Sequence, residues 1–454
     1  MLVQSTNGVS PPIPFRQAIM GSPYAPDGGL YMPVEIPRFT DSEIDAMRGR
    51  SLQERAFLIN QKLLNDEYNL QALGRITMRA FSHPIPTVKL ASGLYVCERF
   101  HGLTDAFKDE GIGQLAGCDE EEYRENPRIT IKLCNSSGDT AGAGARAYAN
   151  VNGVWCILVY PAGRVSPFQE YDIAGTGAPN ITAVRSGKDF DWNDELLSRV
   201  LKDPELSHIP LSTVNSKNLG RLLPQVIAFF EAYFAVTADN EDADVVFCVE
   251  FGNGGHLVAA VIARLMGLPI CDLVAACNIN SPLPEYLSTG VYTPKTSVET
   301  LSTAMDIGNP SNWERLLSLL DGNWRKMEAE IVAYSITDEE VVHTIKRHYA
   351  EPDAYLVEAH TAVGLTAAAR YRDEHAGDDT IIVTMATARP TKFGKTISDI
   401  LGFEPPVRES AANWRSVPLR VTELPTGDYD EFRDIILNVY AHASRSLATG
   451  RSAR

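Results

Sequence analysis

Residues 245–263 read VVFCVEFGNGGHLVAAVIA. The first five residues form an uninterrupted apolar run, a glycine-rich turn follows at residues 252–256, and an alanine-rich apolar segment begins at Leu257. A continuous apolar strand that leads through a loop into a helix is typical of a parallel sheet covered by helices on both faces. This stretch therefore predicts an α/β fold.

Three further segments repeat the pattern of strand, loop and helix, with strands expected at residues 129–134, 154–160 and 381–385. Three of the four expected strands run into a loop rich in Gly, Ser, Thr or Asn. In parallel sheets ligands bind beyond the carboxyl ends of the strands, so we expect the ligand site at these loops. Apolar positions at helix spacing also predict helices at residues 41–47, 52–59 and 429–447, and a frayed end at residues 449–454.

The chain of 454 residues is long enough for two or three domains. Its 44% hydrophobic and 22% charged residues are typical of a soluble globular protein. The formal net charge of -17 argues against nucleic acid and anionic membranes as partners. No uninterrupted apolar run approaches the roughly 20 residues that cross a bilayer. The N-terminus lacks the basic and then apolar pattern of a secretion signal, so we expect a cytoplasmic protein.

Seven cysteines show no paired spacing of the kind that binds metals, and several lie inside apolar runs. This pattern predicts buried thiols in a reducing compartment and no metal site.

Residues 100–109 read FHGLTDAFKD and place Lys108 between an aromatic residue and a carboxylate. A lysine held at low solvent exposure favours its neutral, nucleophilic amine. Such an amine can form a Schiff base with an aldehyde cofactor, above all pyridoxal phosphate. A surface lysine beside an acid has the same local sequence, so this motif alone leaves both interpretations open.

Other loops carry groups suited to anions. Gly252–Gly255 between a strand and a helix is a phosphate cradle or a tight turn. Residues 136–140, SSGDT, either bind a carboxylate or only cap a helix. Residues 215–221, NSKNLGR, combine donors suited to phosphate before a helix expected near Leu222, or form a solvated helix start. Thr387 follows a buried strand, where a hydroxyl could meet a pyridine nitrogen.

Together these motifs resemble, in the same order, those of the threonine synthase family, pyridoxal-phosphate enzymes of the tryptophan-synthase-like fold. The resemblance extends over nearly the whole chain. The similar segments are residues 5–8 with 27–31 (family opening signature), 100–109 (F-H-G-P-T-x-A-F-K-D), 137–140 (S-G-D-T), 215–221 (the phosphate-gripping segment), 252–255 (S-G-N-F-G-D) and 387–393 (T-A-H-P-x-K-F), with further similarity at 306–313 and 359–364.

The resemblance implies an architecture of three parts. An N-terminal threonine-synthase-type domain is expected at residues 1–88 and a catalytic domain at residues 89–420. The catalytic domain would consist of two αβα subdomains with parallel or mixed sheets, and the cofactor would lie between them. A helical tail is expected at residues 421–454.

The resemblance also implies pyridoxal 5'-phosphate as cofactor and a set of site residues. Lys108 would carry the cofactor as the catalytic residue. The other expected cofactor contacts are Asp139, Gly252, Asn253, Gly254, Gly255 and Thr387. The expected substrate contacts are Ser137, Gly138 and Thr140 at a carboxylate, and Asn215, Ser216 and Arg221 at a phosphate.

The implied activity is that of a carbon–oxygen lyase acting on phosphates. The default substrate is O-phosphohomoserine, a small anionic amino acid, which phosphate elimination and water addition convert to threonine. The leaving group, the incoming nucleophile and the oligomeric state, monomer or homodimer, stay open.

Several residues depart from the family pattern around the expected cofactor site, and three of the departures alter charge. These residues are Leu103, Asp105, Glu110, Phe251, Gly254, His256 and Arg389. Either the lineage has drifted with its reaction unchanged, or the chain is a specialised biosynthetic paralogue that performs γ-elimination or γ-replacement on another amino acid. A non-catalytic ligand-binding relative is a third alternative, but a mere binder has no need of Lys108.

Overall fold

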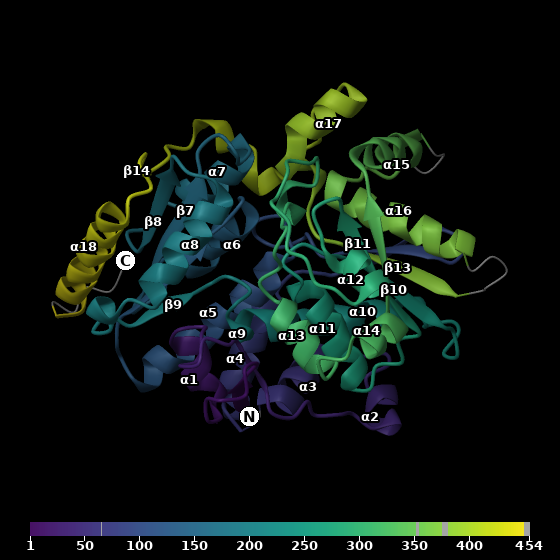
Figure 1. The fold of residues 1–454 in the computed structure, drawn as a ribbon, viewed down its shortest axis with the longest axis horizontal. Helices are drawn as coiled ribbons and strands as arrows, with labels where there is room; N and C mark the ends of the chain where they lie inside the picture. Colours follow the sequence, from purple (N-terminus) through teal and green to yellow (C-terminus); the bar gives the residue numbers. More distant parts are fainter. Residues whose placement is uncertain (65, 351–353, 375–379, 449–454) are drawn as a thin grey trace.

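The four strands expected from the apolar runs are confirmed, each within one residue of the expected bounds, in a computed structural model that describes residues 1–64, 66–350, 354–374 and 380–448. They are β6 (Thr130–Asn135), β7 (Val154–Pro161), β10 (Val245–Glu250) and β13 (Ile381–Ala386). The first two belong to one sheet and the last two to another. Figure 1 shows the two sheets side by side with helices around each, which confirms the α/β class. The expected frayed end at 449–454 lies outside the described residues.

The smaller sheet is parallel throughout, with the strand order β14-β8-β7-β6-β9. Its further strands are β8 (Ile181–Ser186), β9 (Leu211–Thr213) and β14 (Val421–Leu424). Its helices are α5 (Lys108–Glu125), α6 (Asp139–Tyr148) and α7 (Pro167–Ala174) toward the molecular centre, and α8 (Phe190–Leu201) and α18 (Tyr429–Ala448) on the outer face. The helix expected near the C-terminus is therefore confirmed, and the strand before it completes this sheet.

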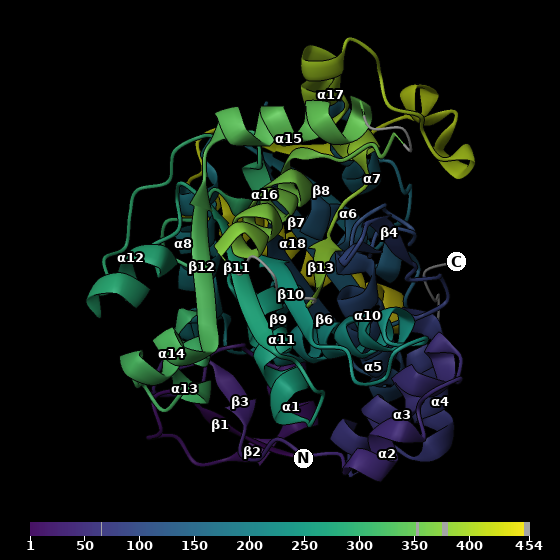
Figure 2. The same cartoon turned by 90° about the vertical axis from the view of Figure 1, so that its right-hand side faces the viewer.

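The larger sheet is mixed, with the order β12-β11-β10-β13-β5-β4, because only the hairpin of β4 and β5 is antiparallel. Its further strands are β4 (Thr87–Ala91), β5 (Leu94–Glu98), β11 (Asp272–Asn278) and β12 (Ile331–Ile336). One face carries α16 (Ala359–Glu374) with α15 (Asp338–Ala350) beyond it, and the other carries α10 (Val226–Val236) and α11 (Gly255–Leu265), as Figure 2 shows from the side.

The first eighty residues form a small antiparallel sheet and four helices beneath both halves (Figure 1). The elements are β1 (Leu2–Ser5), β2 (Ile13–Pro14), β3 (Tyr31–Pro33), α1 (Phe15–Met20), α2 (Asp41–Asp45), α3 (Leu52–Leu64) and α4 (Leu70–Ala80). The helices expected at 41–47 and 52–59 are confirmed. The three short strands were not expected, because strands of two to four residues leave no periodic pattern. The expected domain boundary at residue 88 falls inside β4, and the three-part division stays a prediction.

The remaining helices connect these layers. They are α9 (Leu219–Leu222), α12 (Leu283–Thr289), α13 (Trp313–Leu319), α14 (Trp324–Glu330) and α17 (Gly394–Leu401). Helix α9 begins three residues before the position expected from the sequence.

Two expectations about apolar segments need correction. Six of the seven cysteines are buried, but Cys271 is exposed in the turn just before β11. One helical stretch, Leu219–Val236, is long and apolar enough to cross a membrane by length and composition, although no such run was expected. Some 89% of that stretch is buried inside the protein, as in the core helix of a folded domain.

Helix α18 anchors the C-terminal segment through a few large side chains. Phe432 and Ile436 are fully buried against the outer face of the smaller sheet. Phe432→Ala should therefore lower the free energy of unfolding by about 3–5 kcal/mol, because a buried aromatic side chain leaves a cavity. The control is Asn438→Ala at an exposed position of the same helix, where we expect a change within about 0.5 kcal/mol. Urea denaturation of both variants checks this, and equal midpoints would contradict the placement of α18.

Candidate active site

One pocket between the two halves collects nearly all the residues that the sequence predicts for the site. Lys108, Ser137, Asp139, Thr140, Asn215, Ser216, Arg221, Gly252, Asn253, Gly254, Gly255 and Thr387 line it. Gly138 does not line the pocket. Its φ of +133° and the proximity of a Cβ position there to the Gln169 amide (2.4 Å) show that it serves the turn into α6.

The amino ends of three long helices meet at this pocket. Helix α5 begins at Lys108, α6 at Asp139 and α11 at Gly255, and each of these residues lines the pocket. The first backbone N–H groups of a helix have no partner within it, and its amino end carries about half a positive charge. The pocket is therefore suited to anionic ligands despite the negative net charge of the chain.

Lys108 reaches the pocket with its amine beside a carboxylate. Its Nζ lies 3.2 Å from Asp139 Oδ2 and 4.6 Å from the centre of the Phe107 ring, and its side chain is 13% exposed. Burial lowers the pKa of Lys108, and the attraction of Asp139 offsets this only in part. The adjacent Asp109 faces away, since it accepts hydrogen bonds from the Thr104 N–H and hydroxyl. The neutral amine that the sequence motif suggests is thus favoured by this environment.

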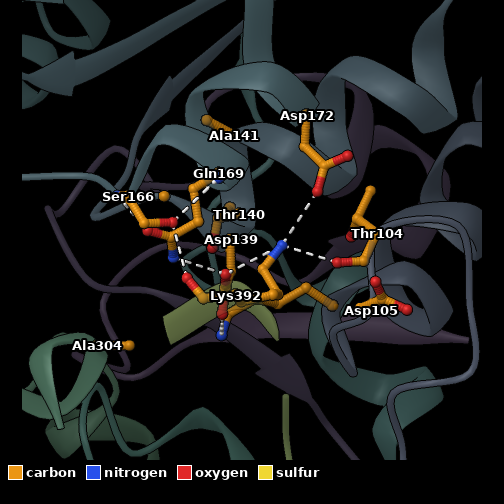
Figure 3. Close-up of polar contacts among 12 residues, drawn as sticks. Thr104, Asp105, Asp139, Thr140, Ala141, Ser166, Gln169, Asp172, Ala304 and Lys392 are labelled. Carbon is orange, nitrogen blue, oxygen red and sulfur yellow. Dashed lines mark hydrogen bonds and ion pairs between the residues drawn. The ribbon is translucent and has the colours of Figure 1, made fainter. Parts of the chain in front are cut away.

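Asp139 is shared between Lys108 and a second lysine, Lys392. Lys392 is fully buried, and its Nζ lies 3.3 Å from Asp139 Oδ1 and 3.3 Å from Asp172 Oδ2. It also donates to the Thr104 carbonyl at 2.7 Å, and Figure 3 shows its ammonium between these groups. Burial acts to raise the pKa of Asp139, but the two lysines outweigh it and hold that pKa below its ordinary value. Asp139 is therefore a carboxylate in this pocket.

The glycine loop at residues 252–255 has the geometry of an anion cradle. Gly254 adopts a left-handed φ of +77° at the start of α11, a conformation that favours glycine. A Cβ at Gly252 would lie 3.0 Å from the Ala304 carbonyl oxygen, so only glycine fits there without a shift. The Asn253 side chain is used internally, because its Oδ1 accepts from the N–H and hydroxyl of Ser311. The loop therefore offers backbone N–H groups rather than side chains.

Arg221 is a cation without an anion. Its side chain is buried, and its guanidinium donates one side-chain hydrogen bond among the described residues, to the Thr140 hydroxyl at 3.4 Å. Burial lowers its pKa to about 10, and no carboxylate forms an ion pair with it among the residues that the structure describes. Burying a charge costs free energy unless an opposite charge joins it. Arg221 therefore marks the place where an anionic group of a ligand would lie.

Two other residues of the 215–221 loop, Ser216 and Asn215, differ in how free their side chains are to bind a ligand. Ser216 Oγ accepts a hydrogen bond from Asn312 Nδ2 at 2.9 Å, which leaves its hydroxyl proton free to donate. The Asn215 amide is instead bonded to the backbone N–H and carbonyl of Asn135, at 3.1 and 2.6 Å. Asn215 thus lines the pocket, but its side-chain amide holds the loop against β6.

A pair of residues whose function the sequence did not suggest joins the two anion-binding loops. Asn312 donates both to Ser216 and to the Asn253 carbonyl, at 2.9 and 3.0 Å. Arg315 is fully buried and donates at 2.7 Å each to the carbonyls of Ser216 and Lys217. The segment 306–313 resembles the family, but only the folded arrangement shows what its polar residues contact.

Most departures from the family pattern contact one another in the structure. Asp105 Oδ1 binds Arg389 Nε at 2.9 Å, and Arg408 also pairs with Asp105. The pairing supports the left-handed φ of +55° that Asp105 adopts just before the lysine. Phe251 occupies the space next to Gly254, since a Cβ at Gly254 would lie 3.2 Å from its ring. The family motif S-G-N-F-G-D has its aromatic residue at the fourth position, where this chain has Gly254. In this chain the ring comes from Phe251, at the first position of the motif.

Two further departures from the family pattern, Glu110 and His256, both contact Arg99. Both Nε and Nη2 of Arg99 bind the Glu110 carboxylate, and its Nη1 lies 2.5 Å from His256 Nε2. Of the seven altered residues, only Leu103, which is 65% exposed, has no such link to another altered residue. Six of the seven altered residues therefore contact another altered residue or share a contact with one.

Comparison with protein families matches three models to this chain. The model described as pyridoxal-phosphate dependent enzyme matches residues 82–387, threonine synthase N terminus matches 3–81, and threonine synthase, C-terminal matches 361–436.

Curated relatives and solved structures agree with these matches. The threonine synthase of Haemophilus influenzae is 34% identical over 412 residues, which cover 90% of this chain and 94% of that protein. The threonine synthase of Escherichia coli is 32% identical, with 90% and 93% covered. The crystal structure of the latter superposes with a TM-score of 0.88 at 30% identity, covering 96% of this chain and 100% of that one. A pyridoxal-phosphate-bound threonine synthase from Brucella melitensis superposes with a TM-score of 0.88 at 28% identity, covering 97% and 99%. The chain belongs to the threonine synthase family.

Proposed function

We propose that this protein is a threonine synthase, which converts O-phosphohomoserine and water to threonine and phosphate with pyridoxal 5'-phosphate as cofactor. The observation that carries the proposal is that Arg221, buried and without an ion pair among the described residues, lines the same pocket as Lys108, a lysine of lowered pKa. The relatives that cover nine-tenths of the chain carry the same name. The compensating departures favour this reaction over that of a specialised paralogue, because the altered residues satisfy each other.

The residues present fit the cofactor. The Gly252–Gly255 loop at the amino end of α11 supplies backbone donors for the cofactor phosphate, and Thr387 lies at the carboxyl end of β13. Lys108 supplies the amine for the aldehyde carbon. When bound, the cofactor withdraws electrons from the substrate carbon next to the amino group.

Substrate recognition follows from the remaining donors. Ser137, Thr140 and the amino end of α6 bind the substrate carboxylate, while Ser216 and Arg221 bind its phosphate. Asn312 holds the loop at 215–221 at a fixed separation from the loop at 252–255, which would bind the cofactor phosphate. Lys108, once displaced by the substrate amine, would be the base that removes the proton from the carbon facing it, because its lowered pKa favours the neutral amine.

The overall change balances with one water molecule. The bond between Cγ and the phosphate oxygen and one C–H bond at Cβ break, while a bond between Cβ and the water oxygen and one C–H bond at Cγ form. The other proton of the water leaves with the phosphate. The proposed substrate is thus a small anionic amino acid. The oligomeric state, the cytoplasmic location and the absence of nucleic-acid and membrane partners stay predictions.

Lys108 should carry the cofactor covalently, because its amine is the one in the pocket with a lowered pKa. Borohydride fixes the cofactor to its lysine, and peptide mapping should then find the label on Lys108. A label on Lys392 or Lys217 would overturn the assignment. Lys392 is the matched comparison, since it is as close to Asp139 but remains charged.

Gly254→Asp should abolish cofactor retention, since a carboxylate at the cradle repels the cofactor phosphate. Gly254→Ala is the control: a left-handed residue with a Cβ costs about 1–2 kcal/mol of stability without adding charge, so this variant should keep the cofactor. Cofactor absorbance per chain after dialysis measures both. Full occupancy in the aspartate variant would place the phosphate elsewhere.

Arg221→Ala should lower kcat/KM for O-phosphohomoserine roughly 10- to 150-fold, the equivalent of losing a charged hydrogen bond of about 1.5–3 kcal/mol. The cofactor absorbance should stay unchanged. Arg325→Ala, at a largely exposed arginine, serves as control and should stay within about twofold. A wild-type protein that ignores O-phosphohomoserine but turns over an amino acid without phosphate would contradict the proposed function.

A further inference from the structure

A chain of four polar residues runs from the core to the wall of the pocket. Glu110 on α5 binds Arg99, which follows β5, Arg99 contacts His256 on α11, and His256 faces Glu250 at the end of β10. Arg99 and Glu110 are fully buried, and His256 and Glu250 are nearly so. Of these four, His256 and Glu250 line the pocket.

The contact with Arg99 fixes the tautomer of His256. A guanidinium has no lone pair, so His256 Nε2 must accept from Arg99 Nη1 at 2.5 Å. Burial and the neighbouring Arg99 lower the pKa of His256 well below its usual value, which keeps the ring neutral. Its proton therefore resides on Nδ1, which lies 3.8 Å from Glu250 Oε2.

Glu250 is the end of this chain that faces the pocket. Neither of its carboxyl oxygens has a hydrogen-bond partner among the described residues, and its side chain is 4% exposed. Gly364 on α16 lies next to it, since a Cβ there would be 3.4 Å from Glu250 Oε1, an ordinary contact distance. Burial raises the pKa of Glu250 well above its usual value, nearby Glu358 adds to this, and Arg99 and Lys108 oppose it.

The proposed reaction requires several proton transfers. Conversion of the substrate's CH2–CH2–O–phosphate group to CH(OH)–CH3 removes a proton at Cβ and adds one at Cγ. The proton at Cα must also leave and return. Without a second proton-carrying group, Lys108 would have to carry out the transfers at Cα, Cβ and Cγ one after another. A second group that holds a proton in the pocket could carry out some of them.

We propose that Glu250 is a second proton-carrying catalytic residue of this pocket, beside a neutral His256 ring that Arg99 and Glu110 hold in place. The neutral carboxyl gives its proton to Cγ and takes one back from the water molecule that adds to Cβ, while Lys108 takes the proton that leaves Cβ, with no change of oxidation state. This inference rests on the proposed function. Two residues of the chain, Glu110 and His256, replace family residues of different chemistry, so the arrangement is a feature of this protein.

The test compares Glu250→Gln with wild type, because glutamine keeps the shape but carries no acidic proton. We expect kcat for O-phosphohomoserine to fall about 10²–10⁴-fold with cofactor absorbance unchanged. The wild-type kcat should decline at high pH, where Glu250 loses its proton, and this limb should be absent from the residual activity of the variant. Glu231→Gln, at a partly buried carboxyl paired with Arg55 at 2.7 Å, is the control and should keep kcat within about twofold.

A second readout needs no substrate. In the cofactor-free protein at neutral pH, the infrared band of a protonated carboxyl should lose intensity in Glu250→Gln and keep it in Glu231→Gln. An unchanged band, or full kcat in Glu250→Gln, would overturn the inference. Failure of the wild type to form threonine would instead refute the proposed function, while the infrared comparison would still decide whether Glu250 holds a proton.

Discussion

The carboxylate of Asp139 lies between two lysines, and the chemistry of the pocket depends on how unequally they are held. Lys392 has a second carboxylate, Asp172, and although burial opposes this, the two acids raise its pKa above the ordinary value. Lys108 has Asp139 alone, so burial prevails and its pKa falls. One lysine therefore remains a fixed cation of the scaffold (Figure 3), and the other keeps an amine that can bind an aldehyde or take a proton.

The departures from the family pattern acquire a meaning once their contacts are known. Asp105 and Arg389 form an ion pair that supports a left-handed backbone beside Lys108. Phe251 fills space next to Gly254, where the family has the ring on the other residue. Paired changes of this kind preserve the shape and charge balance around a site, so they argue for an unchanged reaction with an altered supporting shell.

The sequence predicted what is encoded locally. Continuous apolar runs located β6, β7, β10 and β13, and local motifs together with the family resemblance located twelve of the pocket residues. Contacts between distant segments could not be predicted this way. The amide of Asn215 is spent on Asn135, 80 residues away, and Asn312 joins Ser216 to Asn253 across gaps of 96 and 59 residues. The short N-terminal strands were missed because two to four residues carry no period.

The proposed function requires one pocket to hold two separate phosphate groups, one at Gly252–Gly255 and one at Arg221. Phosphorus NMR of the cofactor-loaded protein during titration with inorganic phosphate tests this most directly. We expect two bound phosphorus resonances, one from the cofactor and one from added phosphate. Arg221→Ala should remove only the second. Phosphate that binds only by displacing the cofactor, or that binds equally well after Arg221→Ala, would contradict it.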